Sequence, residues 1–335
     1  MHVIDGSYGE AGGQILRTSV TLSALTGTPC TITNIRASRP APGLKPQHLM
    51  GLKAAAQICR AETKGFHIGS ETVEFAPTKI VGGDYTVPIK TAGSVTLILQ
   101  VLVPICLHAS DTVTLTITGG TDVKWSPTMS YIRHVFTNIL KKMNAHVDCT
   151  VQKYGFYPKG GGSVKAVIHP WEERKPLKLT ERGPVQKIDV DSVAARFLQK
   201  AQVAERQSTA FCNVLSQYPV DAKNKYVDTL NPGSSFCAAA YCEHSVLGAD
   251  SLGEKRKPAE KVGKEAAVTL KKELESGSAL DTHMGDQIIP YLALVGGKVT
   301  VSRVSEHTKT NIWVCQQFLD TTFTVDRTTI TAVLK

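Results

Sequence analysis

The chain has 335 residues, of which 42% are hydrophobic and 20% are charged, proportions that exclude a disordered protein. Its 38 Lys and Arg residues exceed its 29 Asp and Glu residues, which gives a formal net charge of +9. This excess favours polyanionic partners such as RNA, although proteins that bind no nucleic acid also carry it. The length predicts about two domains.

Eight cysteines are spread along the chain without a CxxC pair or a Cys/His cluster, so neither a disulfide framework nor structural zinc is expected. The opening segment MHVIDGSYGE lacks the charged start and apolar run of a signal peptide. The longest apolar stretch, residues 95–107, is too short and too interrupted to span a bilayer. We therefore expect a cytoplasmic protein that does not enter a membrane.

In chain order, two segments follow the same plan of strand, glycine-containing loop, helix, strand, helix and two strands. In the first segment we predict these elements at residues 2–5, 14–25, 29–35, 47–60, 63–67 and 72–75. In the second we predict them at residues 84–89, 94–107, 112–117, 128–143, 146–152 and 163–168. Gly13 and Gly93, in equivalent loops, are 80 residues apart (93 − 13), the spacing of one supersecondary unit.

A third copy is predicted to be split by an insertion. Its first strand is placed at residues 178–182 and its helix at Gly285, followed by a strand at 298–303, a helix containing His307, and strands at 323–325 and 329–333. The intervening stretch of about 95 residues is too long for an unstructured loop. Within it we predict a helix at 193–215, a strand at 235–242 and a helix at 258–274.

The predicted fold class is therefore α/β (α+β), with three repeated βαβαββ units forming a large domain. A small α/β domain is inserted in the third unit. We place the large domain at residues 1–184 and 277–335 and the inserted domain at residues 185–276. If the three units pack around a pseudo-threefold axis, polar residues of equivalent loops meet at one site: Arg36 and Arg39, Asp122 and Lys124, and His307.

The stretch VSRVSEHTKTNIWVCQQF places His307 just after a predicted strand and in the first turn of a predicted helix. Free backbone N–H groups at such a helix start can hold an anion. A neutral imidazole beside the anion can attack phosphorus. Taken alone, a histidine at a helix start is more often a capping or packed residue than a nucleophile.

Three other motifs have both a functional and a structural interpretation. GSYGEAGGQILR is a strand–glycine loop–helix transition suited to a phosphate, with Glu10 as a candidate metal ligand, or it is simply a tight turn. Arg36 and Arg39 lie in a proline-rich loop where two guanidinium groups can grip a phosphate, or where they are solvated. HMGDQ places Asp286 and Gln287 in the first turn of an apolar helix, able to contact a ribose or base, or to cap the helix.

Together these motifs resemble the RNA 3′-terminal phosphate cyclase family. The segments that carry the resemblance run in order from residue 6 to residue 311: GSYGEAGGQILR, NIRASRPAPGLKPQHL, TAGSVTLILQ, GGTD…SP, GFYPKGGG, LGEKRKPAEKVG, DTHMGDQ and SEHTKTN. Several are long and specific, and they cover nearly the whole chain.

The resemblance implies an enzyme that uses ATP and a divalent metal, Mg²⁺ or Mn²⁺, to convert an RNA 3′-phosphate into a 2′,3′-cyclic phosphate. It implies a histidine nucleophile at His307 that carries AMP, and nucleotide contacts at Gln100, Pro127, His283, Met284, Gly285, Asp286 and Gln287. Phosphate or RNA contacts fall on Arg17, Arg36 and Arg39, and the metal contact on Glu10. The oligomeric state stays open, with a homodimer as one alternative.

This chain departs from the family pattern at two positions, with His283 where members often carry Tyr and Thr128 where they carry a second Pro. Two other functions occur in proteins built from related repeats. A catalytically silent, RNA-binding cyclase-like factor of ribosome assembly lacks the histidine nucleophile, which this chain retains. A carboxyvinyl transferase requires its own array of Lys and Arg residues, which the sequence does not contain.

Overall fold

The computed structural model of the chain describes residues 2–9 and 12–335. Within these residues, three four-stranded sheets share one topology, with their strands numbered here by order in the sequence. The first strand pairs in parallel with the second. The fourth strand lies between the second and the third and is antiparallel to both. The strands, in pairing order, are β1 His2–Asp5, β2 Cys30–Thr33, β4 Val73–Ala76 and β3 Glu62–Lys64; β5 Gly83–Pro88, β6 Val113–Gly119, β8 Gly162–Ile168 and β7 Val147–Lys153; and β9 Leu177–Leu179, β14 Gly297–Thr300, β16 Thr329–Leu334 and β15 Thr321–Asp326. The predicted α/β class is confirmed, and the recurring strand order is the one that three βαβαββ units would give.

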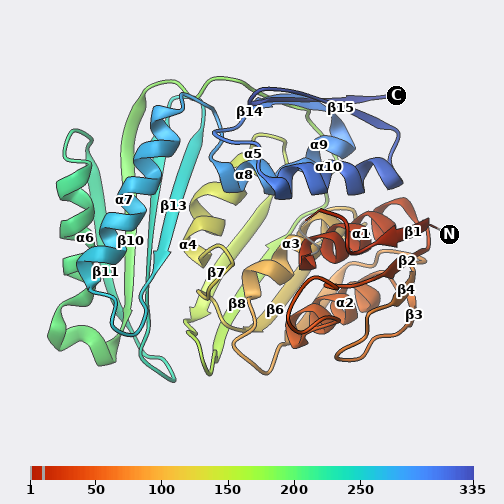
Figure 1. Ribbon diagram of the computed structural model, residues 1–335, viewed down its shortest axis with the longest axis horizontal. Coiled ribbons are helices and arrows are strands. Elements are labelled where there is room, and N and C mark those ends of the chain that lie inside the picture. Colours follow the sequence, from red (N-terminus) through yellow and green to blue (C-terminus); the bar gives the residue numbers. More distant parts are fainter. Residues whose placement is uncertain (1, 10–11) are drawn as a thin grey trace.

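Helices follow the first and second strands of each sheet. They are α1 Gly13–Thr26 and α2 Pro46–Ile58; α3 Val95–Cys106 and a segment made of α4 Met129–Tyr131, a π-helical turn Ile132–Phe136 and α5 Thr137–Lys141; and α8 Thr282–Gln287, α9 Ile289–Val295 and α10 Glu306–Phe318. Helix α1 packs against both α3 and α10, and α2 packs against α3. The helices of the three units therefore meet one another in the middle of the molecule (Figure 1).

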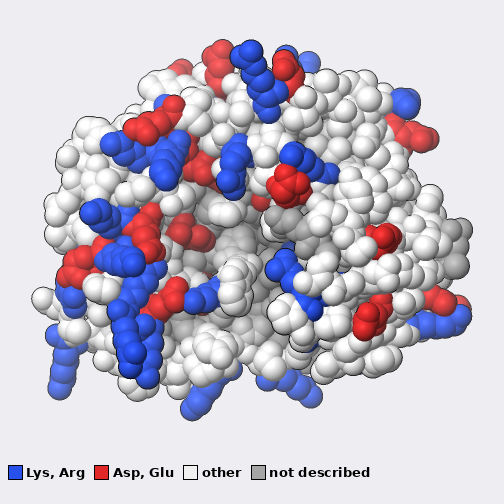
Figure 2. Space-filling model, in the orientation of Figure 1, with Lys and Arg blue, Asp and Glu red and all other residues white. Residues whose placement is uncertain are grey.

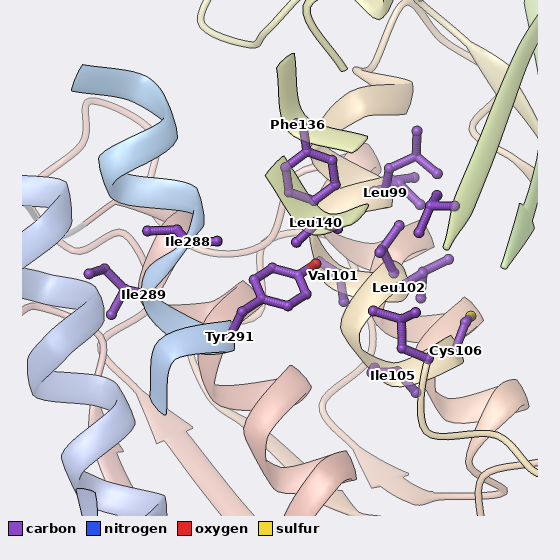
Figure 3. Packing of buried hydrophobic residues seen from close by; sticks show 14 of the residues in the cluster. Leu99, Val101, Leu102, Ile105, Cys106, Phe136, Leu140, Ile288, Ile289 and Tyr291 are labelled. Atoms are coloured by element: carbon purple, nitrogen blue, oxygen red, sulfur yellow. The ribbon is translucent and has the colours of Figure 1, made fainter. Parts of the chain in front are cut away.

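Helix α3 occupies this central position because it is apolar on all sides, and ten of its twelve residues are buried. Ser94 caps it by accepting a hydrogen bond from the N–H of Leu97 at 3.2 Å. Figure 3 shows Val101 and Leu102 of α3 beside Phe136 of the π-helical turn and Tyr291 of α9. The contacts that join the units are thus made by buried aliphatic and aromatic side chains.

The segment between β9 and α8 forms a fourth sheet, with strand order β11-β10-β12-β13, covered by two helices (Figure 1). Its elements are β10 Val185–Ala195, a 3₁₀ helix Arg196–Ala201, α6 Val203–Val214, β11 Val220–Val227, β12 Ser234–Cys242, β13 Val246–Leu252 and α7 Ala259–Glu275. A separate hydrophobic cluster runs from Ile188 to Leu274 and includes Phe211 and Phe236. Because this segment has its own sheet and core, we propose that residues 185–276 fold as a separate domain.

The sequence-based prediction was wrong in parts of this segment. Residues 193–215 were predicted as one helix, but Val193 to Ala195 end strand β10, and the α-helix begins at Val203. Strand β10 pairs on both sides, with β11 and β12, and its last residues are buried. Tertiary burial therefore overrides the helical propensity of the alanines there. Strands β10, β11 and β13 were not predicted.

Candidate functional site

A cavity of about 600 Å³ opens where the helices of the three units meet strand β13 of the inserted segment. In Figure 2 this face is hollow at its centre, and Lys and Arg side chains gather over the inserted segment beside the hollow. The predicted site residues that line the cavity are Arg17, Gln100, Pro127, His283, Asp286, Gln287 and His307. The fold therefore brings together residues that are up to 290 positions apart in sequence (307 − 17).

His307 lies in the first turn of α10, as the sequence predicted. Ser305 caps this helix: its side chain accepts a hydrogen bond from the N–H of Thr308 at 3.0 Å, and the Thr308 hydroxyl lies 3.3 Å from the N–H of Ser305. The carbonyl of His307 accepts a hydrogen bond from Nε2 of Gln14, at the start of α1, at 3.2 Å. The backbone that carries the imidazole is thus fixed both within α10 and from α1.

Asp286 ties α8 to the start of α10. Its Oδ1 accepts hydrogen bonds from the hydroxyls of Ser305 and Thr308, the latter at 2.7 Å. Its backbone carbonyl accepts a bond from Nδ2 of Asn311 at 2.8 Å, and the Oδ1 of Asn311 accepts one from the hydroxyl of Thr18 at 2.7 Å. Together these bonds connect α8 to α10, and α10 to α1, beside the cavity.

The expected place of Asp286 in its helix was wrong. Asp286 does not open an apolar helix but lies next to the last residue of the short helix α8, Thr282–Gln287. Asp281 caps this helix by accepting a hydrogen bond from the N–H of Met284 at 2.8 Å. Asp286 is therefore no cap of its own helix; it binds the first turn of the neighbouring helix α10. Two residues of the same motif, Met284 and Gly285, are buried in the protein and do not line the cavity. A Cβ on Gly285 would lie 2.9 Å from a methyl group of Val301.

The second unit also contributes residues to the cavity lining, beside His283 of α8. Pro127 is held by its carbonyl, which accepts a hydrogen bond from the hydroxyl of Thr96 at 2.9 Å. His283 lies edge-on to Tyr131, with ring centroids 6.5 Å apart and planes at 88°. Thr128, the second departure from the family pattern, donates its N–H to Asp250 at 2.7 Å. A proline at this position has no N–H and would leave Asp250 without that bond.

Cationic groups surround the start of α1. Burial lowers the pKa of Arg17 to about 10, which leaves it cationic at neutral pH. Burial, followed by the charges of Arg17, Arg36 and Lys45, lowers the pKa of His48 to about 3. The Nδ1 of His48 accepts a hydrogen bond from the N–H of Lys45 at 3.2 Å. Because Nδ1 accepts this bond, the proton of the neutral ring is on Nε2. This Nε2 faces Gly13, since a Cβ on Gly13 would lie 2.5 Å from it.

The two arginines of the proline-rich loop have different surroundings. Arg36 donates from Nη1 to the carbonyls of Ala41 and Gly43, at 2.8 and 3.0 Å, so it closes its own loop. Arg39 is exposed, and its Nη2 would be 3.5 Å from a Cβ on Gly12, at the start of α1. Neither arginine lines the cavity, and the convergence expected from the repeats is therefore only partial.

The polar loop of the second unit has one residue at the cavity and one away from it. Lys124 lines the cavity and binds Glu254 of the inserted segment, with Nζ and Oε2 2.6 Å apart. Asp122 is buried away from it: its Oδ1 accepts a hydrogen bond from the N–H of Met129 at 2.8 Å, and burial raises its pKa to about 6. Asp122 therefore fixes the start of α4 and is not a functional group of the cavity.

Glu10, the expected metal ligand, falls outside the described residues. Within residues 2–9 and 12–335 there is no group of three His, Cys, Asp or Glu side chains that could hold a metal ion. The carboxylate of Asp286 already accepts two hydrogen bonds from α10. The same part of the chain has no helix long and apolar enough to cross a membrane.

Several cavity residues could not be identified from the sequence. Gln14 and Asn311 were within recognised motifs but had no assigned role. The structure shows that Gln14 donates a hydrogen bond to the carbonyl of His307 and that Asn311 donates one to the carbonyl of Asp286. Asp250 reaches the cavity from β13, a strand that the sequence did not predict. Trp125 lies at the edge of the cavity and is 93% exposed. Its position two residues before Pro127 was the signal that could have marked it.

Comparison with known proteins agrees with the motifs. Residues 8–325 match the family model described as RNA 3′-terminal phosphate cyclase. The chain is 45% identical to a protein of that name from Pyrococcus abyssi, over 97% of this chain and 95% of the relative. It is 46% identical to that of Thermococcus kodakarensis (96% and 94%) and 44% identical to that of Methanosarcina barkeri (97% and 96%).

Proposed function

The chain belongs to the RNA 3′-terminal phosphate cyclase family, and on that premise we propose that it converts an RNA 3′-phosphate into a 2′,3′-cyclic phosphodiester at the expense of ATP. The reaction passes through AMP bound to His307 and through RNA(3′)pp(5′)A, and it releases pyrophosphate and AMP. The observation that carries the proposal is His307 itself, which lines the cavity from a helix start fixed by Ser305 and Asp286.

In the first step a ring nitrogen of His307 donates its lone pair to the α-phosphorus of ATP. The bond from this phosphorus to the bridging oxygen breaks, and pyrophosphate leaves with the electron pair. A rigid helix start favours this attack because the reacting nitrogen is already held in place when ATP arrives. The hydrogen bonds from Gln14 to the His307 carbonyl and from Ser305 and Thr308 to Asp286 supply this rigidity.

In the second step an oxygen of the RNA 3′-phosphate attacks the same phosphorus, and the P–N bond breaks and restores the imidazole. The RNA phosphate is now part of an anhydride, so AMP has become its leaving group. The vicinal 2′-hydroxyl then loses its proton, attacks the 3′-phosphorus and expels AMP. A phosphate monoester alone lacks such a leaving group, which is why ATP is consumed.

We assign the adenosine of ATP to the part of the cavity between Pro127 and His283, where Gln100 and Gln287 offer hydrogen-bonding groups. We assign the ribose to Asp286, which lines the same cavity. The phosphates are assigned to Arg17, Arg39 and the Nε2–H of His48 at the start of α1, where donors are concentrated. Arg36 contributes by holding the loop that carries Arg39.

Mg²⁺ or Mn²⁺ would neutralise charge on the triphosphate, with Glu10 as the proposed protein ligand. Because Glu10 lies outside the described residues and no other described group forms a metal cage, no step is assigned to the ion.

The experiment is incubation of the protein with ATP labelled on the α-phosphate, without RNA, followed by a denaturing gel and peptide mapping. We expect an acid-labile, alkali-stable label on the peptide that contains His307. His307→Ala should fold normally, with an unchanged circular dichroism spectrum, and carry no label. His169→Ala, an exposed histidine away from the cavity, is the matched control and should be labelled as the wild type is. Full labelling of His307→Ala would refute the mechanism.

The competing function is that of a catalytically silent RNA-binding factor in ribosome assembly. It predicts no label in a folded sample supplied with metal, and a bound ribosomal RNA instead.

A further inference from the structure

Trp125 is the most exposed large apolar side chain among the described residues, at 93%, and it lines the edge of the cavity. Its backbone has φ +62°, a left-handed conformation that costs a non-glycine residue about 1–2 kcal/mol. The other strongly exposed aromatic residues, Tyr157 (75%) and Phe197 (64%), do not line the cavity. A strained backbone that projects an indole beside a cavity indicates a binding role.

The loop that carries Trp125 is anchored on both sides. The hydroxyl of Ser126 donates to the carbonyl of Val123 at 2.8 Å, and the N–H of Thr128 donates to Asp250 at 2.7 Å. Lys124 binds Glu254 of the inserted segment at 2.6 Å. The indole is therefore presented by a fixed loop, so little conformational entropy is lost when a ligand stacks on it.

The loop on the other side of this ion pair carries two further cations. Lys255 and Arg256 are exposed and lie between Glu254 and Lys257, which both line the cavity. Arg256 also has a left-handed backbone, with φ +67°. Neither Lys255 nor Arg256 forms an ion pair with any residue in the described ranges, whereas Lys257 is paired with Glu265. Their charges are thus available to an external anion.

We propose that Trp125, Lys255 and Arg256, the cavity rim, bind the RNA strand that leads to the reacting 3′ end, with a base stacked on Trp125 and backbone phosphates bound by Lys255 and Arg256. This inference rests on the proposed function, which requires an RNA acceptor. Aromatic side chains that stack bases beside cations that follow the backbone are the usual means of holding a single strand.

The exposure of Trp125 favours a strand over the base of ATP. Ligand cavities bury most of a small ligand's surface, but a base stacked on a side chain that is 93% exposed keeps its outer face in water. In a strand the next base covers that face. The cations nearby suit the repeated phosphates of a polynucleotide.

The test separates the two half-reactions. The nucleotidyl-enzyme is prepared with labelled ATP, freed of ATP and mixed with a 3′-phosphorylated oligoribonucleotide or with a nucleoside 3′-monophosphate. For Trp125→Ala we expect transfer to the oligoribonucleotide to fall by about 5- to 100-fold more than self-adenylylation falls, the range expected for the loss of one stacked base. Trp125→Phe should recover most of the transfer. Phe197→Ala, an exposed aromatic away from the cavity, should show no selective loss.

The cations are tested by salt dependence. For Lys255→Ala and for Arg256→Ala we expect the slope of log affinity against log salt to fall in magnitude by about 0.7, the value for one phosphate contact on a single strand. Lys264→Ala, on the exposed side of α7, is the control and should leave the slope unchanged.

Three results for Trp125→Ala would overturn the proposal. Equal losses in adenylylation and in transfer would place the base of ATP on Trp125, and an equal loss of transfer to the nucleoside 3′-monophosphate would place the terminal nucleoside there. The third result is no loss of transfer at all. A wild-type protein that takes no label from ATP would refute the proposed function instead. The rim would then be tested by RNA quenching of tryptophan fluorescence, which Trp125→Phe should abolish. Quenching retained in that variant would overturn the rim as well.

Discussion

Asp281 joins the large repeat-built part of the chain to strand β13 of the inserted segment. It is 1% exposed and accepts three hydrogen bonds: from the hydroxyl of Tyr131 at 2.7 Å, from the N–H of Gly248 in β13 at 2.9 Å, and from the N–H of Met284 in α8 at 2.8 Å. Asp281→Ala leaves these three buried donors unpaired, at a cost of about 1–3 kcal/mol each. Burial raises the pKa of Asp281, so removing the carboxylate also removes a desolvation cost. We expect a net loss of about 3–5 kcal/mol in the free energy of unfolding.

The assay is urea denaturation followed by circular dichroism, with Tyr131→Phe as the matched variant. Tyr131→Phe removes one donor but leaves Asp281 with its two backbone bonds, and we expect a loss of only about 0.5–1.5 kcal/mol. In the double variant the two losses should not add, because both remove the same bond. A loss below about 1 kcal/mol for Asp281→Ala, or a loss equal to that of Tyr131→Phe, would refute the reasoning.

Two further predictions concern buried positions away from the cavity. Burial raises the pKa of Asp122 from its ordinary 3.8 to about 6, so its contribution to stability is full below about pH 4 and is lost as the pH rises through 6. Relative to wild type, Asp122→Asn should therefore gain about 2 kcal/mol in the free energy of unfolding between pH 4 and pH 7. Parallel stability curves in pH-dependent urea denaturation would contradict this. A Cβ on Gly263 would lie 1.9 Å from the carbonyl oxygen of Gln207, so Gly263→Ala should cost about 3 kcal/mol or more by forcing α6 and α7 apart. Gly277→Ala is the control: its Cβ would meet no atom within 4 Å, and only the φ of +71° is unfavourable, so it should cost about 1 kcal/mol. Equal decreases in melting temperature for Gly263→Ala and Gly277→Ala would argue against a clash at Gly263.

Elements with a local signal could be predicted from the amino-acid sequence alone. The first helix ends at Gly27, which adopts φ +68°, and the α10 helix begins after Ser305, because capping residues and glycine conformations act within a few residues. The order of strands and helices in the three units followed from hydrophobic periodicity and was largely correct. His307 was placed in a helix start from these same local signals.

Which polar residues contact one another could be seen only in the folded protein. Asp286 looked like a helix-opening residue, but its carboxylate binds Ser305 and Thr308 of another helix, 19 and 22 positions further on. Arg36, which looked like a phosphate ligand, closes its own loop, and Asp122 is buried under α4. Residues 185–195 form strand β10 because they are buried between β11 and β12, and the local sequence pattern does not reveal these partners. Short-range preferences fix an element, whereas the partners of a polar side chain depend on contacts between segments far apart in the chain.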